Sequence, residues 1–316
     1  MTNAKRLQEA MNVGRRRAAE ILKLRAAASK TRAKALKANP KPLALRIQAV
    51  PRKGMPVPRA TVMQTAGVLV SEGDSWFDYP LHDVLKELED NHGYDVESVA
   101  HRDDPIEEMA YGDNQLNDFT RLIEKLLRRG VKPKAILFSG GGNDIAGNEF
   151  GMLLNHARSS IAGLNDNIVA GVINTRIKIA YITVLTAVTE VCRELTRQPL
   201  PILVHGYDYP VPDGRGFMGG WGPLPGPWLE PGFREKGFVD LPSCTRMAHE
   251  LIERFNTMLA GVAILPQYRH VHYIDLRNSL STGRDYKDWW ANELHPTPRG
   301  WSRIAGRFAA VLQTLP

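Results

Sequence analysis

Three short segments, far apart in the chain, carry side chains that together suit acyl transfer. The tetrapeptide Gly-Asp-Ser-Trp offers the hydroxyl of Ser75 as a nucleophile. The run Ser-Gly-Gly-Gly-Asn-Asp offers the side-chain amide of Asn143, and the pentapeptide Glu-Leu-His-Pro-Thr offers the imidazole of His295. A hydroxyl nucleophile, a base and an amide donor for a developing oxyanion are the groups that serine-dependent ester cleavage needs.

Each segment taken alone also has an ordinary structural interpretation. Gly-Asp-Ser is typical of a tight turn or a helix N-cap, and an asparagine after glycines favours an Asx-turn. His295 is one of nine histidines. The glycine run lacks the spacing of a dinucleotide site, and no Gly-Lys-Ser/Thr follows it as in a phosphate-binding loop. We therefore expect no cofactor at the glycine run. The pattern favours catalysis only because the three segments occur together.

The flanking sequence predicts elements that bring these side chains together. Short apolar runs at 68–70 and 135–138 predict buried parallel strands that end just before Ser75 and Asn143. Apolar residues at helical spacing follow Ser75, and an apolar stripe follows His295 from residue 300 onward. All three side chains are thus expected at the carboxyl edge of one sheet, where open α/β sheets bind ligands. Alternating strands and helices predict a flavodoxin-like, three-layer α/β/α domain.

Over about residues 66–316, the chain resembles the SGNH hydrolases, the family of GDSL-like lipases and esterases. The resemblance lies in the order of the Gly-Asp-Ser, Gly-Asn-Asp and His-Pro blocks. It implies that Ser75 is the nucleophile and that His295 is the general base and then the acid. It also implies that the Asn143 side chain donates to the oxyanion together with the Ser75 backbone amide. The fold that it implies has a sheet of about five strands.

Two positions depart from the family pattern. Asp103 stands where the family usually has a glycine that donates its backbone N–H to the oxyanion, with Gly112 as a fallback. Asn292 stands three residues before the histidine, where members often carry the triad acid. An amide oxygen can orient the ring but cannot stabilise imidazolium as a carboxylate does. We rank Asn292 first as the orienter, and a Ser-His dyad oriented by a backbone carbonyl is a further possibility. Substitute acids, in decreasing order of preference, are Glu293 and Asp288, and then Asp275.

Substrate contacts are expected from two places. Trp76 and Asp144 adjoin the nucleophile and the asparagine directly. The segment 207–242 is rich in Gly, Pro and aromatic residues, including Trp221 and Trp228, and has no clear periodicity. A segment of this length is typical of a functional cover, with a rigid structural insertion as the alternative. Its aromatic side chains suit an acyl chain, an aryl ester or a sugar.

Composition agrees with an enzyme of ordinary size. The chain has 316 residues and is 43% hydrophobic, enough to bury a full core. Two cysteines do not make a disulfide scaffold, and no Cys/His cluster has zinc-ligand spacing, so we expect no metal. No apolar run approaches the ~18 residues of a membrane span, and no secretory signal is evident, so a cytoplasmic location is expected.

The basic charge is concentrated in residues 1–59. This part has 16 Lys/Arg and 2 Asp/Glu, a charge of +14, whereas the whole chain carries +7. Residues 3–38 favour helix by composition, with a patchy apolar face, and prolines from 40 to 58 predict a linker to the domain at 60–316. Such an arm is either a solvated tail or a site for an anionic surface or nucleic acid.

The leading prediction is a serine hydrolase that cleaves a carboxylic ester through an acyl-Ser75 intermediate. Thioesters and acetylated sugars could enter the same chemistry. The alternative is a degenerate SGNH-like protein that binds nucleic acid or an anionic surface through its basic arm. The departures at Asn292 and Asp103 support this alternative, and the joint presence of Ser75, Asn143 and His295 opposes it.

Overall fold

The computed structural model describes residues 2–38, 65–112, 114–147, 149–219 and 224–316. Its central sheet has five parallel strands in the order β2-β1-β3-β6-β7, which is the flavodoxin-like order and agrees with the predicted fold class. The strands are β1 (Val68–Glu72), β2 (Asp95–Ser98), β3 (Ala135–Phe138), β6 (Ile202–His205) and β7 (Val271–Ile274). The strand order reverses between β1 and β3, so the loops that follow these two strands diverge there and leave a crevice.

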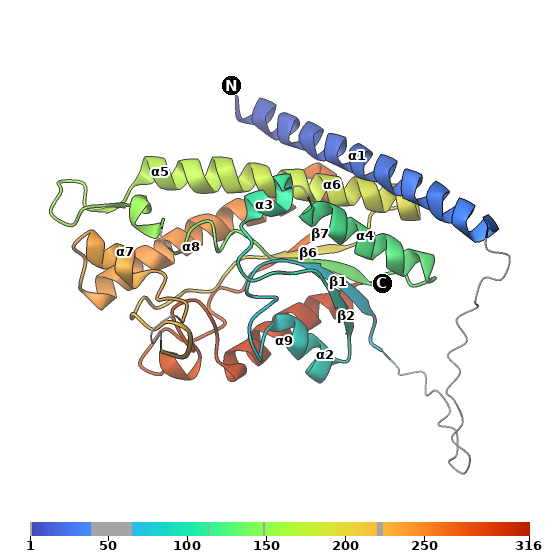
Figure 1. The fold of residues 1–316 in the computed structure, drawn as a ribbon. Helices are drawn as coiled ribbons and strands as arrows, with labels where there is room; N and C mark the ends of the chain where they lie inside the picture. Colours follow the sequence, from blue (N-terminus) through green and yellow to red (C-terminus); the bar gives the residue numbers. More distant parts are fainter. Residues whose placement is uncertain (1, 39–64, 113, 148, 220–223) are drawn as a thin grey trace, which may run out of the picture.

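Helices cover both faces of this sheet, giving the predicted α/β/α layers (Figure 1). On one face, α6 packs against α3, α4 and α8, and on the other face α2 packs against α9. Two short elements, β4 (Leu154–Asn155) and β5 (Gly163–Leu164), form a separate antiparallel hairpin. The helices are α1 (Asn3–Ala38), α2 (Val84–His92), α3 (Ile106–Tyr111), α4 (Gln115–Arg128), α5 (Asp166–Gly171), α6 (Lys178–Thr196), α7 (Glu230–Glu235), α8 (Leu241–Ala263) and α9 (Pro298–Thr314).

The strands predicted at 68–70 and 135–138 are confirmed as β1 and β3, whereas a helix expected from the apolar pattern of residues 150–198 is present only in part. The sequence from 150 to 198 suggests continuous helix, but residues 150–165 form a 3₁₀ turn and the β4–β5 hairpin. Asn165 then caps α5 by accepting the N–H of Ile168 at 3.1 Å. The apolar residues before Asn165 pack under the cover segment instead of along a helix, as Phe150 does against Phe233.

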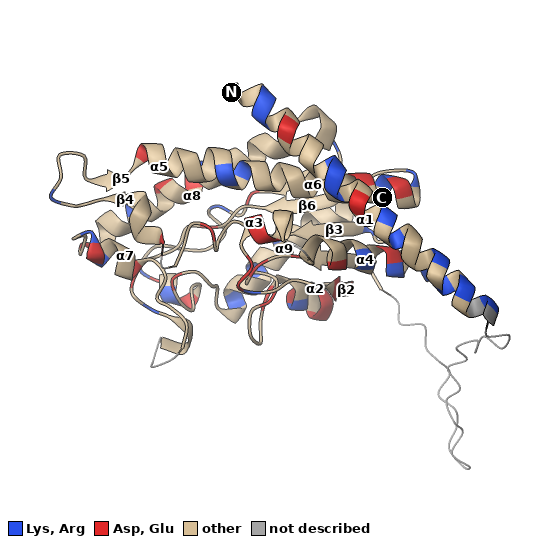
Figure 2. Cartoon of the chain, turned by 45° about the horizontal axis from the view of Figure 1, so that its top comes forward, with Lys and Arg blue, Asp and Glu red and all other residues tan. Residues whose placement is uncertain are grey.

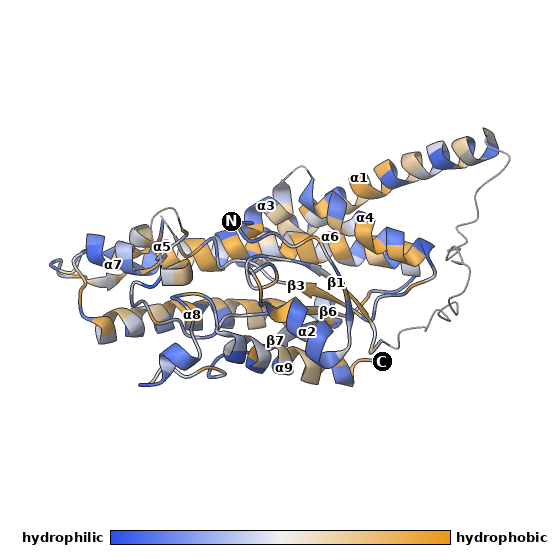
Figure 3. Ribbon diagram, turned by 60° about the horizontal axis from the view of Figure 1, so that its bottom comes forward, coloured by the Kyte–Doolittle hydropathy of each residue, from blue (hydrophilic) through white to orange (hydrophobic). Residues whose placement is uncertain are grey.

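One helical stretch, Asp166–Thr196, is long and apolar enough by length and composition to cross a membrane. Half of the most apolar 18-residue segment of this stretch is buried inside the molecule. Figure 3 shows α6 as a strongly hydrophobic helix enclosed by other helices. Tyr181 on α6 packs edge-on against Phe138 of β3, with ring centroids 5.6 Å apart. Its apolar character is thus used in packing against the sheet and the helices around it.

The first half of α1 is docked on the body instead of extending away as an arm. It lies across α6, forming a further layer over the helical face (Figure 1). Its buried stripe runs through Ala10, Gly14, Ala18 and Ile21. A Cβ at Gly14 would lie 2.6 Å from the carbonyl oxygen of Thr183, so glycine permits this close approach. A hydropathy pattern misses this face because it consists mainly of small residues.

Two arginines extend this interface with polar contacts. Arg17 donates to the carbonyl oxygen of Gly112 at 2.6 Å, and Arg25 pairs with the buried carboxylate of Glu124 at 2.5 Å. Beyond Arg25 the helix leaves the body, and its exposed end carries only basic charges (Figure 2). Binding of this end to an anionic surface or nucleic acid stays a prediction. The predicted proline-rich linker lies outside the described residues.

Gly14→Val is expected to lower the free energy of unfolding by about 1–3 kcal/mol, because the added methyl groups overpack the α1–α6 contact. Urea denaturation measures the loss, and limited proteolysis within residues 2–38 should become faster. Ala19→Val, on the exposed face of the same helix, is the control for a valine in α1 and should lose only helix propensity, about 0.5 kcal/mol. Equal effects of the two substitutions would contradict the docking of α1.

Candidate active site

The three predicted catalytic side chains meet at the crevice between β1 and β3. Ser75 lies in a single turn directly after β1, and Asn143 lies in the loop directly after β3. These strands are hydrogen-bonded neighbours, so their carboxyl ends bring both loops to one edge of the sheet. His295 reaches the same place from the loop that precedes α9, which is capped by the Thr297 hydroxyl. Helix α2 begins only at Val84, so Ser75 lies in a separate turn before that helix.

The hydroxyl of Ser75 contacts the imidazole of His295 directly. Ser75 Oγ lies 2.8 Å from His295 Nε2, within the range of a hydrogen bond between nucleophile and base. The His295 ring is buried, and burial lowers its pKa from 6.5 to about 3. The ring is therefore neutral near pH 7 and can accept the serine proton.

Asn292 fixes the tautomer of that ring. Its Oδ1 accepts the backbone N–H groups of Leu294 at 3.0 Å and His295 at 2.9 Å, which establishes the oxygen as the inward-facing atom. The same oxygen lies 3.0 Å from His295 Nδ1, so Nδ1 must carry the hydrogen and donate it. Nε2 is then left with its lone pair directed at Ser75.

Two aromatic rings enclose the imidazole. Tyr79 stacks on His295 with ring centroids 4.1 Å apart, and its hydroxyl accepts the Asn292 side-chain N–H at 2.9 Å. Burial raises the pKa of Tyr79 to about 12, so the hydroxyl stays protonated. Trp228 meets the ring edge-on at 5.3 Å. Tyr79 was not predicted, since a lone tyrosine four residues after Ser75 carries no sequence signal of this role.

The other candidates for the orienting acid are engaged elsewhere. The buried carboxylate of Glu293 accepts backbone N–H groups of the cover segment. Asp275 pairs with Arg277 at 2.6 Å. Asp288 is exposed to solvent, and the bond that it accepts from the Thr297 hydroxyl goes to its backbone carbonyl, not to its carboxylate. Among the described residues, Asn292 is the side chain that hydrogen-bonds His295 Nδ1.

Asn292→Asp is expected to raise the pKa of His295, because a carboxylate beside Nδ1 stabilises the charged imidazolium. A general base must be unprotonated, so kcat/KM falls as the pH drops through this pKa. The acid limb of the pH profile should therefore move to higher pH by about one unit or more. Asn167→Asp, on the exposed surface of α5, adds the same charge elsewhere and should leave the limb in place. An unshifted limb in Asn292→Asp would contradict the role of Asn292.

A buried carboxylate holds the nucleophile turn in place. Asp74 accepts the Trp76 N–H at 3.0 Å and the Ser139 hydroxyl at 2.7 Å, and it also accepts the hydroxyl of Tyr207. The Tyr207 oxygen in turn accepts the N–H of Gly142 at 3.0 Å. These bonds tie the loop after β1 to the loops after β3 and β6, which fixes Ser75 relative to Asn143.

The Asn143 amide supports the neighbouring loop. Its Nδ2 donates to the carbonyl oxygens of Arg102 at 2.9 Å and Asp104 at 3.1 Å. An oxyanion would have to take over one of these two N–H groups. Asp103, between the two carbonyls, lines the cleft beside Ser75. The fallback Gly112 does not fit the oxyanion role, because its N–H is bonded to the Glu108 carbonyl at 2.8 Å at the end of α3.

The expected substrate contacts separate into three outcomes. Trp76 lines an apolar cavity next to Ser75, and Trp228 lines the cleft on the His295 side. Asp144 instead points into the fold, where its carboxylate accepts the Ile106 N–H at 2.8 Å and lies 3.6 Å from Arg176. Its position therefore differs from the expected one. Trp221 lies outside the described residues.

Glu293 clamps the cover segment to the histidine loop. Its carboxylate accepts the backbone N–H groups of Gly214, Trp228, Leu229 and Glu230 at 2.6–3.0 Å. Arg215 adds bonds to the carbonyl oxygens of residues 290 and 291. Burial keeps the pKa of Glu293 above its usual value, although the four N–H groups act to lower it. The residue next to Asn292 thus holds Trp228 against the imidazole.

Glu293→Gln is expected to lower the free energy of unfolding by roughly 1–3 kcal/mol, because an amide leaves buried N–H donors without acceptors. KM for an ester should rise as Trp228 loses its fixed position. Steady-state kinetics and urea denaturation measure the two effects. Glu235→Gln, an exposed position on α7, is the matched control, and similar behaviour of both variants would rule out the clamp.

Among the described residues, no group of three or more His, Cys, Asp and Glu side chains is arranged to hold a metal ion. Cys192 and Cys244 are buried free thiols on α6 and α8.

No protein-family model and no curated protein matches the sequence. Among solved structures, a lipase from a goat rumen metagenome is 15% identical, with a TM-score of 0.48 over 77% of this chain and 96% of its own. An extracellular lipase from Streptomyces rimosus is 15% identical, with a TM-score of 0.40 over 79% and 100%. A carbohydrate esterase of family 3 from Talaromyces cellulolyticus is 14% identical, with a TM-score of 0.39 over 79% and 100%.

Proposed function

We propose that this protein is a serine hydrolase that cleaves carboxylic esters through an acyl-Ser75 intermediate. The observation that carries this proposal is the continuous hydrogen-bonded chain from Ser75 through His295 to Asn292, with contacts of 2.8 and 3.0 Å. If a serine and a histidine met by chance at the surface, the imidazole would not be expected to be buried and held in one orientation by a second side chain. The chain has the nucleophile, base and orienter of a catalytic triad, with an amide in place of the acid.

In the first half-reaction, Ser75 Oγ attacks the ester carbonyl carbon while its proton passes to His295 Nε2. The carbonyl oxygen becomes an oxyanion, which the Ser75 N–H would bind together with one Asn143 N–H that leaves its present carbonyl partner, with the Asp103 N–H as a third donor. The bond to the leaving oxygen then breaks, and His295 returns the proton to that oxygen. This leaves the acyl group on Ser75 and releases an alcohol.

In the second half-reaction, water takes the place of the alcohol. His295 accepts a proton from water as its oxygen attacks the acyl carbon, and the proton then returns to Ser75 Oγ as the carboxylic acid leaves. The amide of Asn292 keeps the ring oriented through both steps. Since an amide gives the transient imidazolium less stabilisation than a carboxylate, the low pKa of His295 is retained and the base stays active in mildly acidic solution.

A fluorophosphonate probe with intact-mass detection tests this proposal. The wild-type protein should gain one adduct, which peptide mapping places on Ser75. Ser75→Ala should lose the adduct, and both Ser75→Ala and His295→Ala should lower kcat/KM for p-nitrophenyl acetate by at least about 10³-fold. Ser281→Ala, a partly exposed serine outside the site, is the matched control. An adduct on another residue, or turnover that survives Ser75→Ala, would overturn the proposal.

The alternative of a degenerate hydrolase loses much of its support. It drew on Asn292 and Asp103 as departures from a catalytic pattern. Asn292 contacts His295 Nδ1 at 3.0 Å, and Asp103 lines the cleft beside Ser75, so both positions are compatible with catalysis. The exposed basic end of α1 is independent of this site, and an anionic partner for it would accompany the hydrolase activity instead of replacing it.

A further inference from the structure

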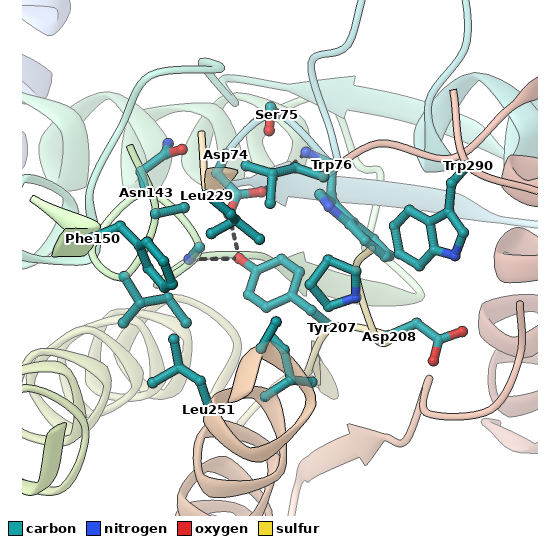
Figure 4. A pocket seen from close by; sticks show the side chains of 17 residues that line it. Asp74, Ser75, Trp76, Asn143, Phe150, Tyr207, Asp208, Leu229, Leu251 and Trp290 are labelled. Atoms are coloured by element: carbon teal, nitrogen blue, oxygen red, sulfur yellow. Dashed lines mark hydrogen bonds between the residues drawn. The ribbon is translucent and has the colours of Figure 1, made fainter. Parts of the chain in front are cut away.

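Two cavities of different character meet at Ser75. The first is a small, apolar chamber of about 50 Å³, and the second is a larger and more polar cleft of about 300 Å³. Both are lined by Ser75, Asn143 and Leu294, so an ester carbonyl at Ser75 would have one cavity on each side. Figure 4 shows the chamber below Ser75, with Tyr207 in its middle and Leu251 at the far end.

The position of His295 decides which part of an ester enters which cavity. His295 lines the cleft and is not among the residues that line the chamber. It must hand its proton to the leaving oxygen, so that oxygen and the alcohol attached to it have to lie on the cleft side. The acyl chain then extends in the other direction, into the chamber.

The chamber presents an apolar surface suited to a hydrocarbon chain. Its polar members are already engaged, since Tyr207 donates to Asp74 and the Asp208 carboxylate accepts the N–H groups of Asn278 and Leu280 at 2.8 and 2.6 Å. The exception is the Trp290 indole N–H, which has no partner among the described residues. Figure 4 shows the six-membered ring of Trp290 facing Trp76, so this N–H lies on the side away from Trp76. The apolar lining comes chiefly from Ile145, Phe150, Leu229, Leu251, Ile252 and Leu294.

The size of the chamber limits the length of that chain. Its volume of about 50 Å³ is one third of the roughly 150 Å³ apolar cavity that accepts a six-carbon benzene ring. A rigid chamber of this size holds about two carbons, and modest side-chain movement would admit about four. The floor is formed by Ala248, Leu251 and Ile252 on α8, a helix packed against the sheet, which limits deeper entry.

We propose that this hydrolase selects esters with a short acyl group, from acetyl to about butyryl, attached to an alcohol larger than the acyl group. This rests on the proposed function, since it assigns the two sides of the same Ser75 site. The cleft suits the larger alcohol, because it offers the aromatic rings of Tyr79, Phe217 and Trp228 together with the polar side chains of Arg102 and Asp103.

A series of p-nitrophenyl esters with acyl chains of two to ten carbons tests the proposal, because only the acyl part varies. The wild-type kcat/KM should be highest for chains of about two to four carbons and at least about tenfold lower from six carbons upward. A wild-type optimum at eight or ten carbons would overturn the assignment of the chamber.

Two substitutions in the chamber floor should move the optimum in opposite directions. Leu251→Ala enlarges the chamber and should raise the ratio of kcat/KM for the six-carbon over the two-carbon ester by about tenfold or more. Ala248→Val reduces it and should suppress the four-carbon ester relative to the two-carbon ester. Leu259→Ala, two turns further along α8 and buried outside the chamber, is the matched control for lost stability and should keep the wild-type profile.

The outcomes separate this inference from the proposed function. If the wild-type protein shows neither fluorophosphonate labelling nor ester turnover, the proposed function and the acyl chamber are both overturned. Turnover that depends on Ser75, with a chain-length profile that neither Leu251→Ala nor Ala248→Val changes, would overturn the acyl chamber alone. If one floor variant fails to fold, the shift in the other and the wild-type profile still decide the question.

Discussion

Burial of the His295 ring against an amide, instead of a carboxylate, makes its protonated form costly, and the pKa falls to about 3. The site is arranged around this neutral ring. Asn292 accepts from Nδ1 while two backbone N–H groups hold its oxygen in place, so the lone pair of Nε2 faces Ser75. The neighbouring carboxylate of Glu293 is turned toward the cover segment, where four backbone N–H groups satisfy it.

The scaffold supplies this arrangement through the parallel sheet. Because β1 and β3 are neighbours, the loops that carry Ser75 and Asn143 leave the same edge, and Asp74 bonds to both Ser139 and Tyr207 across that edge. The cover segment places the Trp228 ring edge-on against the imidazole. The cover segment, held by Glu293, and the packed helix α8 leave unequal spaces on the two sides of Ser75. This difference in size underlies the proposed selection for short acyl groups.

Much of the sheet and the main site residues could be predicted because their signals are local. Apolar runs locate β1 and β3, and the residues just after them are Ser75 and Asn143. The roles of Tyr79 and Glu293 depend on contacts with segments more than 60 residues away, so no local pattern indicates them. The docking of α1 was missed for a different reason. Its contact face relies on Ala10, Gly14 and Ala18, whose small size permits close packing but adds little to a hydropathy pattern.

An uncharged Ser-His-Asn arrangement of this kind should form a covalent acyl-enzyme. The most direct measurement is rapid acid quenching of the protein during turnover of p-nitrophenyl acetate, followed by peptide mass mapping. A transient acetyl group is expected on the peptide that contains Ser75, and in His295→Ala it should form slowly or not at all. Release of p-nitrophenol with no acetyl group on Ser75 at any time, or with the acetyl group on another residue, would contradict it.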